Sequence, residues 1–229
     1  MPVHIHPTAA LAPRALLPGD PGRALMLAQL LLDAPRMFNH NRGLWGYTGA
    51  AADGEPLTIQ STGMGGPSAA IVLEELCDLG LERAIRVGTC GALDGGLALG
   101  DLLVADAALA ADGTSRALGA GDRVAADPGL VAALQAAAGD GVRSGAIVTS
   151  DLFYERDDER VAGWARDGAL AIEMEAAALL RVAELRGVRA ACLLAVTDVF
   201  VDGERRRIEP AALVRAAERL GAVAAAALR

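Results

Sequence analysis

The residues with the most evident chemical potential lie in the segment 85–93, which reads Ile-Arg-Val-Gly-Thr-Cys-Gly-Ala-Leu. Arg86 places a guanidinium in an otherwise apolar strand, where a charge is costly to bury unless it meets an anion. Gly88 and Gly91 lack a Cβ, so we expect the backbone to turn there and approach a ligand closely, with the Thr89 hydroxyl between them. Together these features predict an oxyanion site, most simply one for phosphate. The alternative is an ordinary strand end with a solvated arginine, since short glycine motifs often mislead.

Three further segments place polar side chains where strands are expected to end, which is where an open α/β sheet binds its ligand. They are the turn 19–23 (Gly-Asp-Pro-Gly-Arg), the pair Arg42-Gly43, and the stretch 173–178 (Glu-Met-Glu-Ala-Ala-Ala). Each also has a structural interpretation. The arginines could be solvated or bond a carbonyl, and the two glutamates could simply favour a helix N-terminus.

The composition excludes several kinds of chemistry. All 21 basic residues are arginine, so Schiff-base lysines and the P-loop lysine are excluded. A net charge of −8 without a basic stripe argues against nucleic acid as a partner, although local arginines can still hold a small anion. Three scattered cysteines lack metal-ligand spacing, and His4 and His6 lack a third ligand, so we expect no metal. Without a signal peptide or a bilayer-spanning run, we expect a cytoplasmic protein with no membrane partner.

Strand-like and helix-like segments alternate along the 229 residues, which predicts an α/β fold. Expected strands cover 14–17, 44–50, 57–62, 84–87, 101–108, 146–149, 169–172 and 190–196. Expected helices cover 23–32, 128–138, 159–166, 175–186 and 213–228, and a further helix opens within 63–68 and runs to about 79. The dipeptide Asp53-Gly54 predicts a hairpin between the second and third strands. No linker or repeat divides the chain, so we predict one domain over residues 1–229.

Five motifs in register give the chain a family resemblance. They are residues 17–23 (Leu-Pro-Gly-Asp-Pro-Gly-Arg), 42–43, 86–91, 150–154 (Ser-Asp-Leu-Phe-Tyr) and 173–177. The chain resembles the nucleoside phosphorylases, and more narrowly the hexameric purine nucleoside phosphorylases of bacteria, which are related to the uridine phosphorylases. The resemblance runs from about His4 to Asp198 and is loose around Arg116 and after Asp198.

This resemblance implies a fold and a reaction. The fold would be a single α/β domain with a central mixed sheet of barrel-like character, flanked by helices. In the reaction, inorganic phosphate attacks the anomeric carbon of a ribonucleoside, which gives free base and ribose 1-phosphate. Phosphate is a co-substrate, and no other cofactor is implied.

The resemblance also assigns the phosphate positions, which match Gly19, Arg23, Arg86, Thr89 and, from a neighbouring subunit, Arg42. Three guanidiniums around one dianion would supply bidentate hydrogen bonds and position the nucleophile. Because a neighbour contributes to the site, a homo-oligomer is implied, and we expect a hexamer built as a trimer of dimers.

Ribose and base positions follow from the same resemblance. Met174 and Glu175 match the ribose-binding residues, with Glu175 accepting from the 2′- and 3′-hydroxyls and favouring a transition state of oxocarbenium character. His4 matches a histidine that contacts the 5′-hydroxyl across the subunit interface. Phe153 matches the aromatic residue against the base, and we also place Glu173 at the base.

The leaving group depends on Asp198, which ends an apolar strand where a buried carboxyl is costly without a role. The resemblance places it where the family protonates purine N7. Its ordinary pKa, near 3.9, must rise through burial or nearby phosphate for it to act as a general acid. One arginine of 205–207 is expected to assist. The spacing is shorter than the usual pattern, and we assign Arg207; the alternative for the triplet is a solvated loop, which would suit two of the three arginines.

Three alternatives remain at this point. Uridine phosphorylases read uracil with a glutamine and an arginine that the stretch 155–159 (Glu-Arg-Asp-Asp-Glu) does not supply at the matching places. Hydrolytic nucleosidases of the same fold lack the phosphate-gripping arginines that this chain retains. A non-catalytic nucleoside-binding module would not need both Glu175 and Asp198. The preferred base, whether of inosine, guanosine or adenosine, stays open.

Overall fold

Strand β5 (Arg83–Ala92) is the branch point of the sheet in the computed structural model, which describes residues 2–201 and 204–229. Along one edge, β5 pairs in parallel with β10 (Arg189–Val201). Along the other edge, it pairs with β1 (Arg14–Leu17) as far as Arg86, and from Gly91 it pairs with β9 (Ala171–Glu173). Residues 87–90 therefore have no strand partner on that edge, and the sheet forks there.

The fork belongs to a closed ring of five strands. β10 pairs antiparallel with β6 (Leu102–Ala111), β6 pairs in parallel with β8 (Arg143–Ser150), β8 pairs in parallel with β9, and β9 returns antiparallel to β5. The predicted mixed sheet with barrel-like character is therefore confirmed. Outside the ring, β4 (Pro56–Gln60), β3 (Gly46–Ala50) and β2 (Asp33–Asn39) follow β1 in that order, β7 (Arg123–Ala125) joins β6, and β11 (Glu204–Arg207) joins β10.

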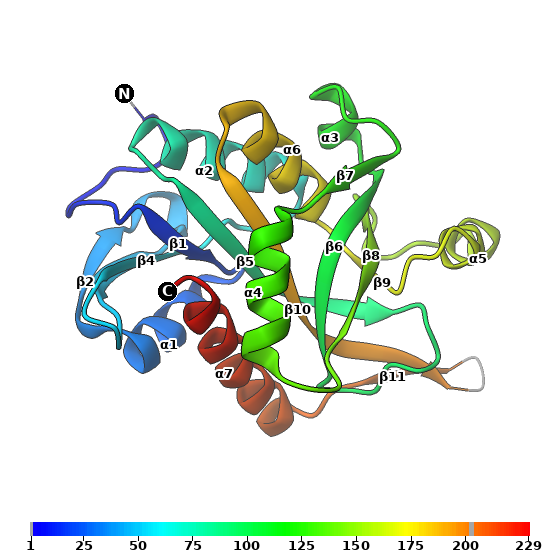
Figure 1. Cartoon of the computed structure of the whole chain (residues 1–229). Helices are drawn as coiled ribbons and strands as arrows, with labels where there is room; N and C mark the ends of the chain where they lie inside the picture. Colours follow the sequence, from blue (N-terminus) through cyan, green and yellow to red (C-terminus); the bar gives the residue numbers. More distant parts are fainter. Residues whose placement is uncertain (1, 202–203) are drawn as a thin grey trace.

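Two groups of helices pack on the sheet (Figure 1). α2 (Gly66–Asp78) contacts α6 (Ala176–Arg186), while α7 (Pro210–Ala227) contacts both α1 (Pro21–Leu31) and α4 (Pro128–Ala138). The short α3 (Gly113–Ala117) lies against α2 and α6, and α5 (Asp158–Arg166) stands apart beyond β9. Helices α1 and α4 each begin with a capping aspartate and a proline in the first turn, which the sequence shows directly.

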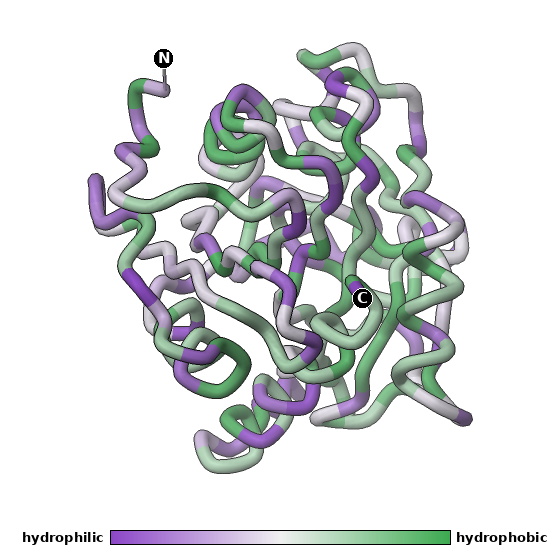
Figure 2. Tube along the Cα trace, turned by 60° about the vertical axis from the view of Figure 1, so that its left-hand side comes forward, coloured by the Kyte–Doolittle hydropathy of each residue, from purple (hydrophilic) through white to green (hydrophobic). Residues whose placement is uncertain are grey.

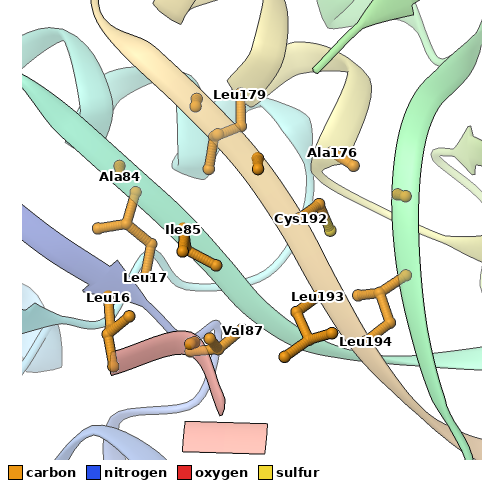
Figure 3. Packing of buried hydrophobic residues seen from close by; sticks show 14 of the residues in the cluster. Leu16, Leu17, Ala84, Ile85, Val87, Ala176, Leu179, Cys192, Leu193 and Leu194 are labelled. Atoms are coloured by element: carbon orange, nitrogen blue, oxygen red, sulfur yellow. The ribbon is translucent and has the colours of Figure 1, made fainter. Parts of the chain in front are cut away.

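The core is aliphatic, because aromatic residues make up only 3% of the chain. Leu16, Leu17, Ile85, Leu193 and Leu194 from β1, β5 and β10 are fully buried, and Figure 3 shows them along these neighbouring strands, between α6 on one face and α7 on the other. Parallel strands covered on both faces are expected to read as continuous apolar runs, as these do. Along the outer helices, hydrophobic and hydrophilic segments alternate (Figure 2), which is typical of helices with one face on a core.

The predicted helix 128–138 matches α4, and most other predicted elements, including the β3–β4 hairpin, are confirmed with boundaries shifted by a few residues. Three elements were not predicted: β2, whose residues are mostly exposed, and the short α3 and β7. The loop predicted for residues 205–207 is wrong, because Glu204–Arg207 forms β11 against β10. The predicted turn at Gly88 and Gly91 is also wrong. Both glycines lie inside β5, and neither has a positive φ.

Candidate active site

A cavity of about 1680 Å³ opens at the fork of the sheet. Its wall includes Gly88, Thr89 and Gly91 of β5, the end of β10, and the loops that follow β1 and β4. Because β1, β4, β5 and β10 run parallel, their carboxyl ends meet at this edge, where parallel sheets place ligands. The cavity exceeds the usual size of a small-molecule site, so it has room for two reactants side by side.

Arg86 lies at the closed end of this cavity and is almost fully buried. Its Nε donates to Glu173 Oε2 at 2.9 Å, and its Nη2 donates to Glu175 Oε2 at 2.5 Å. Burial alone would disfavour the cation, but Glu175 and Glu173 outweigh it and raise the pKa of Arg86. The solvated-arginine alternative is therefore wrong. No hydrogen bond within the described residues uses Nη1, so this nitrogen remains available to a ligand.

Gly88 makes room for this arrangement. A Cβ on Gly88 would lie 2.8 Å from Arg86 Nη2 and 3.0 Å from Leu194, closer than packed atoms allow. The missing side chain at Gly88 therefore leaves space for the Arg86 guanidinium, which comes from two residues earlier on the same face of the strand. Gly88 does not form a turn.

Glu173 is the most heavily bonded carboxylate of the site. It accepts from Arg86 Nε, from the Thr149 hydroxyl at 2.5 Å, and from the backbone amides of Glu175 and Ala176 at the start of α6. Burial raises the pKa of Glu173, the Arg86 charge opposes that rise, and Glu175 adds to it. All these bonds are to the protein, so the structure makes Glu173 the support of Arg86 and of the α6 N-terminus. Its predicted base contact stays a prediction.

Glu175 connects the Arg86 cluster to the start of α2. Its Oε1 accepts from the Gly65 amide at 2.6 Å, while its Oε2 meets Arg86. Gly65 has a φ of 88°, in the region that favours glycine, and it leads directly into α2. Both carboxylate oxygens thus have fixed directions, and Met174 beside them also lines the cavity.

The turn after β1 brings Gly19 and Arg23 to the cavity. Backbone bonds from Thr62 to Pro18 and from Gly63 to Gly19 fix this turn to the loop after β4. Burial lowers the pKa of Arg23, nearby Asp20 opposes the change, and Arg86 adds to it. Within the part of the chain that the structure describes, the Arg23 guanidinium forms no ion pair, although the carboxylates of Asp20 and Glu175 lie near enough to favour its charge.

The opposite end of the cavity contains Asp198, which is 6% exposed. It accepts from Thr197 Oγ1 and, at 2.9 Å, from Arg205 Nε. Arg207 Nη1 lies 3.9 Å from the same Asp198 oxygen, so Arg205 is the better partner in place of the predicted Arg207. The Arg205 guanidinium also stacks over Phe153 at 4.9 Å from the ring centroid.

Two predicted site residues, His4 and Arg42, do not line the cavity of their own chain. His4 Nδ1 lies 2.7 Å from Glu75 Oε1. Arg42 has a φ of 56° and a ψ of 19°, a conformation that is rare without a glycine and that collects at functional sites. The Asn41 side chain donates to the His4 carbonyl, so the two segments are joined.

Three supporting residues were not predicted from the sequence: Gly65, Glu75 and Thr149. Gly65 stands in a glycine-rich segment whose start of a helix was noticed, but nothing indicated that its amide would bond Glu175. Glu75 and Thr149 are single polar residues in a helix and a strand, and no local pattern marks them. Arg205 was one of the three arginines expected to assist Asp198, and its contact with Asp198 is seen only in the structure.

No metal centre is evident in residues 2–201 and 204–229, where no three His, Cys, Asp or Glu side chains gather. The His6 ring contacts the backbone, with Nε2 3.1 Å from the Val3 carbonyl oxygen. Within the same residues, no helix is long and apolar enough to cross a membrane.

Known proteins similar to this chain identify its family. The sequence profile of the Phosphorylase superfamily matches residues 13–229. The chain is 40% identical over 212 residues to a purine nucleoside phosphorylase DeoD-type of Clostridium beijerinckii, which covers 89% of each protein. It is 40% identical to a guanosine phosphorylase of Halorubrum lacusprofundi, over 84% of this chain and 80% of that one. It is 38% identical to a DeoD-type enzyme of Geobacillus kaustophilus, over 91% of both. The chain therefore belongs to the phosphorylase superfamily.

Proposed function

We propose that the chain catalyses the reversible phosphorolysis of purine ribonucleosides to free base and ribose 1-phosphate. The observation that carries the proposal is a single cavity with a buried guanidinium–carboxylate cluster at one end and a buried aspartate at the other. The names of the similar proteins, purine nucleoside phosphorylase and guanosine phosphorylase, support the same reaction.

Phosphate binds, in this proposal, between Arg23 and Arg86. Arg86 offers its unused Nη1, and Arg23 offers a cation without an ion pair in the described chain. Thr89 and the Gly19 turn line the same part of the cavity and complete the cradle. Arginines fixed around a dianion orient one phosphate oxygen for attack, and positioning of this kind removes much of the entropic barrier.

Glu175 holds the ribose at the same end. Its oxygens are already aimed by Gly65 and Arg86, so it can accept from the 2′- and 3′-hydroxyls without moving, and Met174 packs beside it. As the bond between C1′ and N9 lengthens, positive charge develops on the sugar, and the nearby carboxylate stabilises it. The phosphate oxygen then forms the new bond to C1′.

Asp198 completes the reaction by protonating N7 of the departing purine. The electron pair of the broken C1′–N9 bond goes to the base, and the Asp198 proton neutralises it. Arg205 fixes the carboxyl through Nε and at the same time stacks on Phe153, the residue proposed to lie against the base. One arginine therefore orders two parts of the base site. Glu173 supports Arg86 through its hydrogen bond to Nε, and its contact with the base stays a prediction.

We further propose that the active form is a homo-oligomer, with a hexamer as the expected form. His4 and Arg42 lie outside the cavity of their own chain and are joined through Asn41, so they would enter a neighbour's cavity as a pair. The three cysteines are all free, which fits the reducing cytoplasm.

The test is the release of base from inosine, guanosine, adenosine and uridine, measured by chromatography with and without inorganic phosphate. We expect release that requires phosphate, a matching yield of ribose 1-phosphate, and little turnover of uridine. Release without phosphate would identify a hydrolase instead, and binding without release would identify a non-catalytic module. Light scattering on the same sample tests the oligomer, which a fully active monomer would contradict.

A further inference from the structure

The N-terminal arm, residues 3–5, is fixed to helix α2 by one carboxylate. Glu75 accepts from the backbone amides of Val3, His4 and Ile5 at 3.0, 2.9 and 2.7 Å. The same carboxylate contacts His4 Nδ1 at 2.7 Å. Burial alone would raise the pKa of Glu75, but these bonds from Ile5, His4 and Val3 outweigh it and lower the pKa to about 2. Glu75 is therefore a charged anchor throughout the physiological range.

This contact determines which nitrogen of His4 is free. A carboxylate accepts only from a protonated ring nitrogen, so Nδ1 carries a hydrogen and Nε2 points away from Glu75. Within the described residues, no hydrogen bond uses His4 Nε2, and the His4 side chain is 28% exposed. The ring is thus held by one nitrogen and presents the other outward, as in carboxylate–histidine pairs that orient a functional imidazole.

A second anchor fixes the other side of the arm. Asn41 Nδ2 donates to the His4 carbonyl at 2.9 Å, and Asn39 Oδ1 accepts from the His6 amide at 2.9 Å. Asn39 is fully buried and also donates to the Leu44 carbonyl, so the arm is bonded to the loop that contains Arg42. A histidine in a merely solvated arm would not need bonds on both sides.

We infer that Glu75 is a positioning residue, which orients His4 so that Nε2 meets the 5′-hydroxyl of a nucleoside bound in a neighbouring subunit. The inference rests on the proposed function, in which His4 enters a neighbour's cavity. Glu75 itself touches no substrate. It acts by fixing the tautomer, the ring direction and the backbone of His4 together.

Kinetics with two substrates test this role. The wild-type protein should cleave inosine with a kcat/KM about tenfold above that for 5′-deoxyinosine, because only inosine carries the hydroxyl that His4 meets. Glu75→Gln keeps the size of the side chain but removes its charge, and this ratio should fall to the value found for His4→Ala. The double variant should show no further fall, because Glu75 acts through His4.

The matched control is Glu74→Gln on the same helix, where Glu74 pairs with Arg186 on the surface. Its substrate ratio should stay at the wild-type value, and thermal unfolding and light scattering should establish that each variant is folded and assembled. A wild-type ratio in folded Glu75→Gln, or in His4→Ala, would overturn the inference.

A second measurement does not depend on catalysis. The chain has only three histidines, so ¹H–¹⁵N spectra of the rings are assignable by comparison with His4→Ala. Nδ1 of His4 should carry the hydrogen in the wild type, and this signature should disappear in Glu75→Gln. An Nδ1 without hydrogen in the wild type would overturn the inference. Base release that does not need phosphate would instead count against the proposed function alone.

Discussion

The two ends of the cavity are built differently. At the end proposed to bind phosphate and ribose, the side chains of Arg86, Glu173 and Glu175 are 4%, 1% and 7% exposed, and they bond one another and two backbone segments. At the base end, Asp198 is buried, but its partner Arg205 is 37% exposed and Phe153 is 49% exposed. The first end is a closed network of charges, whereas the second is one carboxyl held by a partly exposed cation and a neighbouring hydroxyl.

This difference predicts at which end the effects of two substitutions should be energetically coupled. In a dry network, removal of one member leaves the others charged and unpaired, so effects should not add. Near solvent, water replaces a lost partner, so the loss of stability should be smaller, and the loss of activity should be confined to the step that the residue serves. Substitutions that reduce activity at the base end should therefore leave the stability of the fold largely intact, whereas those at the buried end should also destabilise the fold.

The largest effect is expected for Asp198→Ala. A positioned proton donor contributes about 10²–10⁴-fold, so cleavage of inosine or guanosine should slow by that factor while phosphate affinity changes little. A nucleoside that already carries positive charge on the purine, such as 7-methylguanosine, needs no proton, and its cleavage should be largely spared. Steady-state kinetics on both substrates measure the contrast. Equal losses would mean that Asp198 positions the base or supports the fold.

Arg86→Ala should reduce both activity and stability. It leaves Glu173 and Glu175 buried without their cation, and breaking a buried ion pair costs about 3–5 kcal/mol. Denaturant unfolding should show this loss, together with an increased phosphate requirement. The double variant Arg86→Ala/Glu173→Gln should regain part of the stability, since one stranded charge is gone. If the two substitutions simply add, the closed network of the buried end does not exist.

The same variant should acquire a pH dependence. Burial raises the pKa of Glu173 above 4.5 and Arg86 opposes the rise, so removal of Arg86 should raise it further. A carboxyl whose pKa is higher in the folded chain than in the unfolded chain contributes stability below the unfolded value and loses it as the pH rises. Unfolding of Arg86→Ala should therefore become easier as the pH increases above about 4.5. The Glu173→Gln double variant should lack this trend, and a persistent trend would assign it to another group.

The two ends also differ in how well the sequence predicted them. The residues of the buried end could be predicted because they stand in compact motifs. Arg86 interrupts an apolar strand, and Glu173 and Glu175 flank Met174 at a helix start. What the sequence could not provide was the pairing, which depends on β5, α6 and the Gly65 loop meeting in space. The five-stranded ring was likewise beyond local patterns, because it closes through pairings between distant strands. At the base end, three consecutive arginines look alike, and their side-chain contacts with Asp198 separate them, whereas the register of β11 against β10 alone would favour Arg207.

That register supports the smallest prediction. Arg207 is the residue directly opposite Asp198 in the ladder, yet its guanidinium is 64% exposed and 3.9 Å away, whereas Arg205, opposite Phe200, donates at 2.9 Å. A hydrogen bond between charged groups is worth about 1.5–3 kcal/mol when shielded, and solvent screening reduces this, so Arg205→Ala should slow inosine cleavage about tenfold. Arg207→Ala, its matched control on the same strand, should stay within about twofold because an exposed, longer contact contributes little. As with Asp198→Ala, 7-methylguanosine should be less affected than inosine by loss of Arg205. Kinetics of both variants on both substrates decide the assignment, and a larger loss at Arg207 would return the role to that residue.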